Sequence, residues 1–412
     1  ILTESDTDNV RAMTPIDTRI PFSENVRRVE PSTTLAVSAL AKGLRAQGRD
    51  ILNLSAGEPD FPTPSFIVRA GIAALEAGET RYTPTPGLPA LREAIAAALA
   101  RTHGIDAAGN EVVVSTGAKQ ALFNLVFALT GPGDRVLVPV PYWTSYPQIV
   151  GLARAEMVPV QGPAERGYRV GPAELEAAWR EGTRALILNS PSNPSGSVYR
   201  LEELEAIAGW ARERDVWLVS DEIYSRLCYL GDRAPGVLDL PAELRERAVL
   251  INGASKAYAM TGWRIGYSYT TPELATKLAA LQSHVTSNAA TPSQHAAIAA
   301  FTATAGQERE LAAMVDEFRA RRDLVVRLLE EHLPGTPSVA PEGAFYLFFR
   351  ADAWFDDDRP DSVALCKWLI EEAGVALVPG SAFGDDRYVR LSFAASREEL
   401  TDAFGRLARA LG

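Results

Sequence analysis

Short apolar runs alternate with helical patterns of hydrophobic and polar residues from about residue 66 to residue 305. The helical patterns occupy several of the gaps, for example residues 88–102, 119–129 and 201–214. Short, continuous apolar runs are typical of strands that are buried on both faces. The alternation therefore predicts an α/β fold, with a largely parallel sheet covered by helices on both sides. The five runs interpreted as strands are residues 111–115, 135–138, 184–188, 216–219 and 248–251.

The pattern changes after about residue 306. A long helix is expected over residues 307–333, and a shorter helix near residues 362–373. Strand-like runs lie at residues 345–349 and 388–393. This mixture predicts a second, smaller α+β domain that the N-terminal segment completes. The expected division is an arm (1–28), which is polar and aperiodic, a large domain (66–305), and a small domain made of residues 29–65 and 306–412.

Polar, aromatic and glycine residues follow all five predicted strands. Because the carboxyl ends of parallel strands lie at one edge of a sheet, these residues should come together there. The convergence predicts a ligand site at that edge, and it is stronger than any single motif. The residues concerned are Thr116 to Lys119, Pro141 to Trp143, Asn189 with Asn193, Asp221 with Tyr224, and Ser255 with Lys256.

Composition excludes several classes of function. The 412 residues carry a formal net charge of −11 without a cluster of Lys and Arg, which argues against a nucleic-acid surface. No apolar run is long enough for a membrane span. Cys228 and Cys366 lie in apolar contexts outside any Cys/His pattern, so we expect core packing, no metal site and a reducing, cytoplasmic compartment.

The segment from Asn252 to Arg264 contains the most informative chemistry. Lys256 follows a buried strand in a turn of small residues, with Ser255 before it and Arg264 eight residues later. Partial desolvation lowers the pKa of such a lysine and frees its amine for Schiff-base chemistry. Arg264 suits a phosphate group. A reactive lysine beside a phosphate site predicts pyridoxal 5′-phosphate as cofactor, although a surface lysine and a salt-bridging arginine are the alternative.

Several motifs extend this prediction over roughly nine tenths of the chain. The chain resembles the fold-type I, pyridoxal-phosphate-dependent class I aminotransferases, in the branch of bacterial aspartate and aspartate/prephenate aminotransferases. This resemblance implies a large domain with a mostly parallel seven-stranded sheet and a smaller α+β domain. The matching stretches are residues 29–34, 55–61, 190–196, 220–224, 252–267 and 389–393.

The resemblance implies a role for each cofactor-binding residue. Lys256 is expected to hold the cofactor covalently and to act as general base, and Asp221 to keep the pyridinium nitrogen protonated. Asn193 and Tyr224 should bond the phenolic oxygen, and Trp143 should stack on the ring. The expected phosphate site consists of Gly117, Ala118 and Lys119 at a helix start, together with Ser255 and Arg264.

The same resemblance implies how substrate is held. Arg390 should bind the α-carboxylate as a bidentate fork, aided by the Gly57 backbone and by Asn193 and Trp143. Lys119 is expected to reach the distal carboxylate of acidic substrates, and Thr34 matches a position associated with prephenate. Tyr82 should reach the phosphate of the other subunit, which implies a homodimer with shared sites.

Three departures from the family pattern stand out. Ser195 replaces a threonine, and residues 385–387 add charge before Arg390. Ala118 replaces a glycine in the phosphate turn, so that turn must avoid positive φ at this position. The predicted function is ping-pong transfer of an amino group between an L-amino acid, aspartate or glutamate first, and a 2-oxo acid. The alternatives are a lyase or cyclase acting at Cβ or Cγ, a prephenate or aromatic aminotransferase, and a non-catalytic pyridoxal-phosphate sensor.

Overall fold

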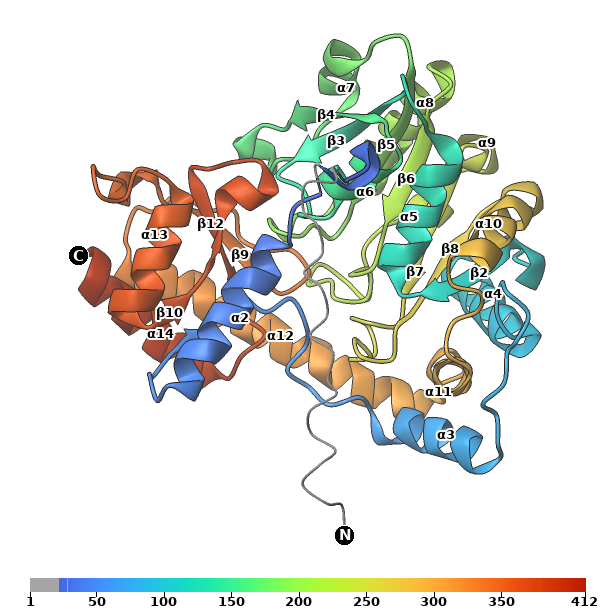
Figure 1. The fold of residues 1–412 in the computed structure, drawn as a ribbon, viewed down its shortest axis with the longest axis horizontal. Helices are drawn as coiled ribbons and strands as arrows, with labels where there is room; N and C mark the ends of the chain where they lie inside the picture. Colours follow the sequence, from blue (N-terminus) through green and yellow to red (C-terminus); the bar gives the residue numbers. More distant parts are fainter. Residues whose placement is uncertain (1–21, 28) are drawn as a thin grey trace, which may run out of the picture.

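The computed structural model describes residues 22–27 and 29–412, so most of the predicted arm lies outside the described residues. A seven-stranded sheet forms the centre of the larger part of the molecule (Figure 1). All its neighbouring strands are parallel except β8, which is antiparallel to both its neighbours. In spatial order the strands are β2 (Val112–Thr116), β8 (Ile265–Tyr269), β7 (Ala248–Gly253), β6 (Trp217–Asp221), β5 (Thr183–Asn189), β3 (Arg135–Val140) and β4 (Glu156–Gln161).

The five predicted strands are all present, and every end agrees with the prediction within two residues, whereas β4 and β8 were not predicted. β4 lies at the edge of the sheet and has exposed residues and Pro159, which an edge strand tolerates. β8 contains Gly266 and Ser268, so its sequence lacks the continuous apolar run of a buried strand. Both omissions arise because the apolar run was the signal for a strand.

Both faces of this sheet are buried. In β5, Leu186 and Leu188 belong to one hydrophobic core, and Ala185 and Ile187 belong to the core on the opposite face. The first core includes residues of α3 (Ser65–Glu76), α4 (Pro89–His103), α7 (Pro172–Ala178), α8 (Leu201–Glu213) and α11 (Thr291–Phe301), with the short α9 (Ala242–Arg245) packed nearby. The second core includes residues of α5 (Ala118–Leu129), α6 (Tyr146–Leu152) and α10 (Pro272–Val285). The predicted helices at 88–102, 119–129 and 201–214 correspond to α4, α5 and α8.

The smaller part of the molecule has its own sheets and core. A three-stranded antiparallel sheet has the order β11 (Val378–Pro379), β12 (Tyr388–Ser392) and β9 (Tyr346–Arg350). β1 (Leu52–Asn53) pairs in parallel with β10 (Val375–Ala376), which joins the N-terminal segment to the C-terminal one. The helices here are α2 (Thr33–Ala46), α12 (Ala305–His332), α13 (Ser362–Trp368), continued by a π-helical turn at Leu369–Ala373, and α14 (Arg397–Leu411). The short α1 (Glu24–Arg27) instead contacts α6 of the larger part.

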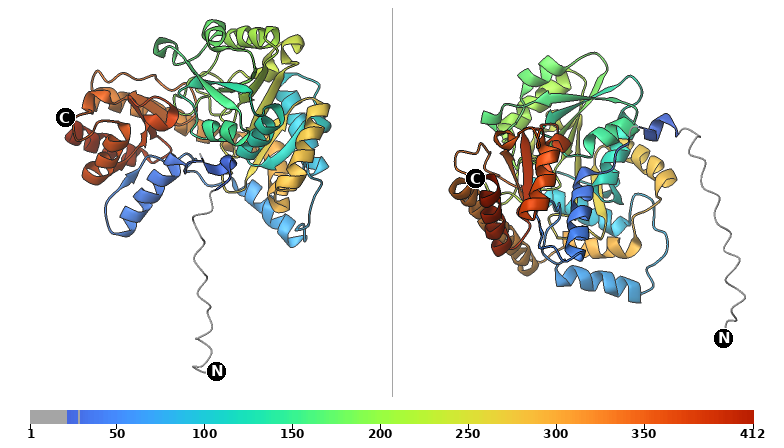
Figure 2. Two further views of the ribbon diagram at one scale, coloured as in Figure 1. Left: turned by 45° about the horizontal axis from the view of Figure 1, so that its top comes forward. Right: turned by 60° about the vertical axis from the view of Figure 1, so that its left-hand side comes forward.

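The long helix α12 links the two parts. Its Leu311 belongs to a core of the large sheet, while Phe318 and Val325 belong to the core beside the three-stranded sheet. Figures 1 and 2 show α2 beside the C-terminal elements, as the pairing of β1 with β10 requires. The separate core of the smaller part fits the expected pair of domains, and the domain limits at residues 65/66 and 305/306 stay a prediction. Within the described ranges, no helix is long and apolar enough to cross a membrane.

Candidate functional site

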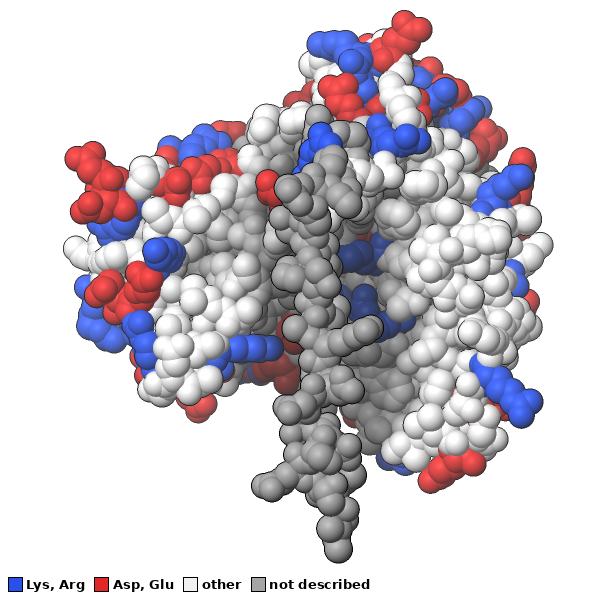
Figure 3. Space-filling view, viewed as in Figure 1, with Lys and Arg blue, Asp and Glu red and all other residues white. Residues whose placement is uncertain are grey.

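A cavity of about 580 Å³ lies at the carboxyl edge of the large sheet, where the smaller part of the molecule faces it. Figure 3 shows Lys and Arg side chains deep in a hollow between the two parts. The structure brings twelve predicted site residues to the wall of this cavity. They are Thr34, Gly57, Ala118, Lys119, Trp143, Asn193, Asp221, Tyr224, Ser255, Lys256, Arg264 and Arg390.

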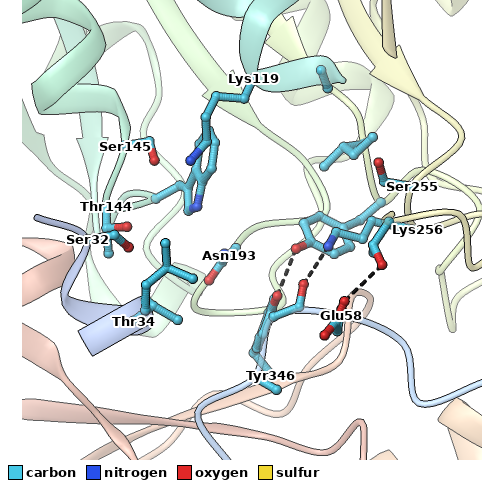
Figure 4. Close-up of a pocket in the computed structure, with 18 of the residues that line it drawn as sticks. Ser32, Thr34, Glu58, Lys119, Thr144, Ser145, Asn193, Ser255, Lys256 and Tyr346 are labelled. Carbon is cyan, nitrogen blue, oxygen red and sulfur yellow. Dashed lines mark hydrogen bonds between the residues drawn. The ribbon is translucent and has the colours of Figure 1, made fainter. Parts of the chain in front are cut away.

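Lys256 lies three residues after the end of β7 and enters the cavity half-buried (Figure 4). Its amine donates a hydrogen bond to the carbonyl of Gly57. Burial lowers the pKa of Lys256 to about 8; the nearby Glu58 carboxylate opposes this shift, and the cations Arg264, Arg390 and Lys119 add to it. About a tenth of this amine is therefore unprotonated at pH 7, far more than in an ordinary lysine, and the unprotonated form is the one that acts as nucleophile or base.

Asp221 is the last residue of β6 and its side chain is buried. It accepts hydrogen bonds from the Tyr146 hydroxyl (2.8 Å) and from the Ile223 backbone N–H (3.3 Å). Burial raises the pKa of Asp221 to about 6, although both hydrogen bonds and the charge of Lys256 oppose the shift. Such a carboxylate is costly without a cationic partner, so a positively charged ligand atom beside it is favourable.

Cationic and amide groups gather at the N-terminus of α5. Gly117, with φ of +83°, precedes Ala118, the first residue of the helix, so the expectation that Ala118 avoids positive φ agrees with the structure. The first N–H groups of a helix have no partner within it and can bind an anion. The Arg264 guanidinium lies against Gly117, where a Cβ would collide with it. Gly117 itself is not part of the cavity wall.

Lys119 projects from the first turn of α5 into the cavity (Figure 4). Its amine lies 4.9 Å from the centroid of the Trp143 ring. Burial lowers the pKa of Lys119, and the charge of Arg264 lowers it further. A lysine at a helix N-terminus is disfavoured by roughly 0.3–1 kcal/mol, so an anion opposite it would explain its position.

Arg390 lies on β12 and only 1% of it is exposed. Its guanidinium donates to Asn193 Oδ1 (3.0 Å) and to the carbonyl of Ser55 (2.7 Å), and it lies 4.4 Å from the centroid of the Tyr346 ring. Its buried Nε has no hydrogen-bond partner among the described residues. Burial lowers the pKa of Arg390, and the phenol groups of Tyr346 and Tyr224 act in the opposite direction. A buried cation bound only by neutral groups requires an anionic ligand.

Several residues of the site were not predicted from the sequence. Tyr146 bonds Asp221, and Tyr346 exchanges a hydrogen bond with the Tyr224 hydroxyl (2.8 Å). Glu58 accepts a hydrogen bond from the Thr261 hydroxyl (2.8 Å) and shares the cavity wall. Tyr146 follows Trp143 closely, which is a weak signal. Tyr346 lies in an apolar run that gives no signal of function.

Tyr82 lies outside this cavity and is 90% exposed in the single chain. Thr34 lies near the start of α2, on the opposite side of the cavity from Lys256 (Figure 4). No group of His, Cys, Asp and Glu suited to a metal ion occurs in the described part of the chain. Both cysteines are buried and free.

Comparison with known proteins agrees with this geometry. Residues 49–407 match the family model described as aminotransferase class I and II. The chain belongs to this family. An aspartate aminotransferase of Bacillus subtilis is 42% identical over 389 residues, 94% of this chain and 98% of the relative. An aspartate/prephenate aminotransferase of Nitrosomonas europaea is 40% identical over 95% of this chain and 99% of its own length.

Solved structures give the same result for the fold. The aspartate aminotransferase of Thermus thermophilus, solved with maleate, superposes with a TM-score of 0.90 at 41% identity. The match covers 95% of this chain and 100% of that one. The resemblance inferred from the motifs, the fold class and the assignment as a transferase enzyme are confirmed.

Proposed function

We propose that the chain is a pyridoxal-phosphate-dependent aminotransferase that moves an amino group between an L-amino acid, preferably aspartate or glutamate, and a 2-oxo acid. One observation supports this most directly: the buried guanidinium of Arg390, without a carboxylate partner in the described chain, shares a cavity with the Lys256 amine. An α-carboxylate bound at Arg390 leaves the substrate Cα and nitrogen within the same cavity. This arrangement suits proton transfer at Cα by Lys256.

The residues present fit pyridoxal 5′-phosphate. Asp221 offers a buried carboxylate to the ring nitrogen, while the N-terminus of α5, Ser255 and Arg264 offer N–H, hydroxyl and guanidinium donors to the phosphate. When bound, the cofactor supplies an electron-accepting ring that stabilises negative charge at Cα of the substrate. The unprotonated Lys256 amine then moves the proton, and Asp221 keeps the ring nitrogen charged.

Other residues orient the reactants. Asn193 and Tyr224 would bond the phenolic oxygen of the ring, and Asn193 also accepts a hydrogen bond from Arg390 through its Oδ1. Trp143 packs edge-on against Tyr146, with ring centroids 5.4 Å apart, which holds its face in the cavity wall. Gly57 adds a backbone contact for the substrate carboxylate.

The preference for dicarboxylic substrates rests on Lys119. Its amine lies in the cavity without an acidic partner among the described residues, and Thr34 lies on the α2 side. The Thermus thermophilus relative was solved with maleate, a dicarboxylate. We include prephenate as a further acceptor, because relatives with this activity match almost the whole chain.

The proposal also includes a homodimer and a cytoplasmic location. Tyr82 is an aromatic side chain that is almost fully exposed in one chain, as expected if it completes the phosphate site of a second copy. Two buried, free cysteines are compatible with a reducing compartment. Neither point affects the assignment of the reaction.

The test is incubation of the cofactor-loaded protein with a panel of single amino acids. Aspartate and glutamate should convert the cofactor to its amine form, seen as a shift in absorbance, with release of one equivalent of 2-oxo acid. A second oxo acid should reverse the shift. A lyase or cyclase would instead release a Cβ or Cγ leaving group and restore the original spectrum without an added oxo acid. Borohydride reduction followed by mass spectrometry should place the cofactor on Lys256; a label on another lysine contradicts the proposal.

A further inference from the structure

The turn that contains the reactive lysine has an unfavourable backbone. We call residues 256–264 the Lys256 turn. Two of its residues with side chains, Ala259 and Arg264, have φ values of +48° and +57°. Residues with a Cβ rarely adopt this region, and they stay in it only when the surrounding structure fixes them. Arg264 is also one of the cavity cations, so the conformation of the turn decides where its guanidinium points.

The hydroxyl of Thr63, which lies outside the turn, forms hydrogen bonds with two of its residues. Thr63 Oγ1 donates to the carbonyl of Ala259 (2.6 Å) and accepts from the indole Nε1 of Trp263 (3.1 Å). A threonine hydroxyl has one proton and two lone pairs, so it can make both bonds at once. Trp263 is further restrained by α3, because a Cβ on Gly71 would lie 2.6 Å from its ring.

Thr63 belongs to a segment, residues 55–63, that borders the cavity. We call this segment the strap. At one end the Ser55 carbonyl accepts from Arg390, and in the middle the Gly57 carbonyl accepts from Lys256. Glu58 accepts from Thr261, inside the turn. The strap therefore contacts both the lysine and the arginine that the proposed function requires.

We propose that Thr63 is a positioning residue, whose hydroxyl holds the Lys256 turn in the conformation that presents the Lys256 amine and the Arg264 guanidinium to the cavity. The proposal rests on the proposed function for the identity of the ligand. Its physical basis is independent of that function. Two residues of the turn have left-handed backbone conformations, four hydrogen bonds join the strap and the turn, and the Thr63 hydroxyl makes two of the four. Thr63 itself does not line the cavity.

The test compares Thr63→Val, which keeps the shape but removes the hydroxyl, with Thr63→Ser, which keeps the hydroxyl. Thr130→Val is the matched control, since it removes another hydroxyl that bonds a backbone carbonyl (Val126, 2.7 Å) at the far end of α5. That end is about 18 Å from the start of the helix. Thermal unfolding of the apoproteins measures the general structural cost of each substitution.

The first specific readout is the dissociation constant of pyridoxal 5′-phosphate from the apoprotein. Thr63→Val should weaken binding about tenfold, the effect expected from losing one or two net hydrogen bonds. Thr63→Ser should stay within about twofold of the parent, and Thr130→Val should not change the constant. Failure of the parent apoprotein to bind the cofactor would instead refute the proposed function.

The second readout is the pH at which an amine-reactive probe, trinitrobenzenesulfonate, labels Lys256 in the apoprotein. The parent midpoint should lie near pH 8, where burial places the pKa of Lys256. Because a looser turn exposes the amine, Thr63→Val should move the midpoint upward, towards the ordinary lysine value. The charged groups that face this amine, and that all variants keep, are Glu58, Lys119, Asp221, Arg264 and Arg390.

The two readouts together test whether Thr63 positions the Lys256 turn. Loss of cofactor affinity and an upward midpoint in Thr63→Val, both rescued in Thr63→Ser, support the proposal. The proposal is overturned if Thr63→Val is destabilised like Thr130→Val but keeps the parent's dissociation constant for the cofactor and the parent's midpoint of Lys256 labelling. Equal defects in Thr63→Val and Thr63→Ser also overturn it. If Thr63→Val does not fold, Trp263→Phe removes the N–H donor together with part of the indole ring and should weaken binding by at least about threefold; an unchanged constant would again refute the role.

Discussion

Asp221→Asn removes the charge of a buried carboxylate whose hydrogen-bond donors, the Tyr146 hydroxyl and the Ile223 N–H, are both neutral. The two donors bond different oxygens of Asp221, so asparagine can keep its Oδ1 for the Ile223 N–H while its Nδ2 donates to the Tyr146 hydroxyl, which can also accept. In the apoprotein the cofactor's positive nitrogen is missing, so the charge of Asp221 is a net cost there. We expect the Asp221→Asn apoprotein to be more stable than its parent at neutral pH and to bind the cofactor more weakly.

The magnitude follows from the pKa of Asp221, which burial raises to about 6. An ordinary aspartate has a pKa of about 3.9, and each unit of difference is worth about 1.4 kcal/mol. The pKa of Asp221 is higher in the folded protein than in the unfolded chain. Folding of the parent apoprotein therefore loses no free energy at Asp221 below about pH 4, and it loses a growing amount as the pH rises to about 6. Asparagine does not titrate, so its advantage should be about 1 kcal/mol at pH 4.5 and about 3 kcal/mol at pH 7.

Urea unfolding of the two apoproteins at pH 4.5, 6 and 7, followed by tryptophan fluorescence, measures this difference. Asp232→Asn is the control, because Asp232 is exposed and its replacement should change stability by no more than about 0.5 kcal/mol at any pH. An Asp221→Asn apoprotein that is no more stable than its parent at pH 7, or whose advantage does not grow with pH, would refute the reasoning. The position would then not hold a costly buried charge.

The other predictions concern single contacts of the site. Lys119→Ala should lower kcat/KM roughly ten- to a hundred-fold for aspartate and glutamate but little for alanine, and an equal loss for both classes would contradict its role. Tyr82→Phe should loosen the cofactor, and mixed dimers with Lys256→Ala should regain up to about half of the activity per dimer, because one site then has neither defect; no recovery despite proven subunit exchange would argue against a shared site. Tyr146→Phe removes a hydrogen bond that lowers the pKa of Asp221, so the urea series should show a steeper fall in apoprotein stability between pH 4.5 and 7.

The central strands were predictable because helices cover both faces of the sheet. Burial on both sides requires continuous apolar runs such as those of β5 and β7, and it also places their polar ends at one edge. β4 and β8 lack such runs for the local reasons given above. The helix α12 was predicted from its periodicity. The periodicity does not indicate that one end of the helix packs in a core of the large sheet and the rest in the core of the smaller part.

The residues of the site that the sequence left out act through contacts between distant segments. Tyr146 and Asp221 are 75 residues apart, and Tyr224 and Tyr346 are 122 residues apart. The sequence pattern predicts that a tyrosine in an apolar run packs in the hydrophobic core. Only the fold shows that its hydroxyl has a hydrogen-bond partner. Lys256, Asp221 and Arg264 were found because their chemistry is unusual for their local surroundings. Thr63 and Glu58 were missed because a threonine and a glutamate are ordinary residues in a polar loop.

The bond between Arg390 and the Ser55 carbonyl has a consequence for how the protein is made. The two residues are 335 positions apart in the sequence. β1 likewise cannot form its pair until β10 has been synthesised. At a synthesis rate of about 5–20 residues per second, the strap emerges from the ribosome roughly 20–70 s before its partner. The nascent chain can build its seven-stranded sheet during this interval, but the N-terminal segment stays unpaired. The cofactor therefore meets a complete pocket only after β12 has been made.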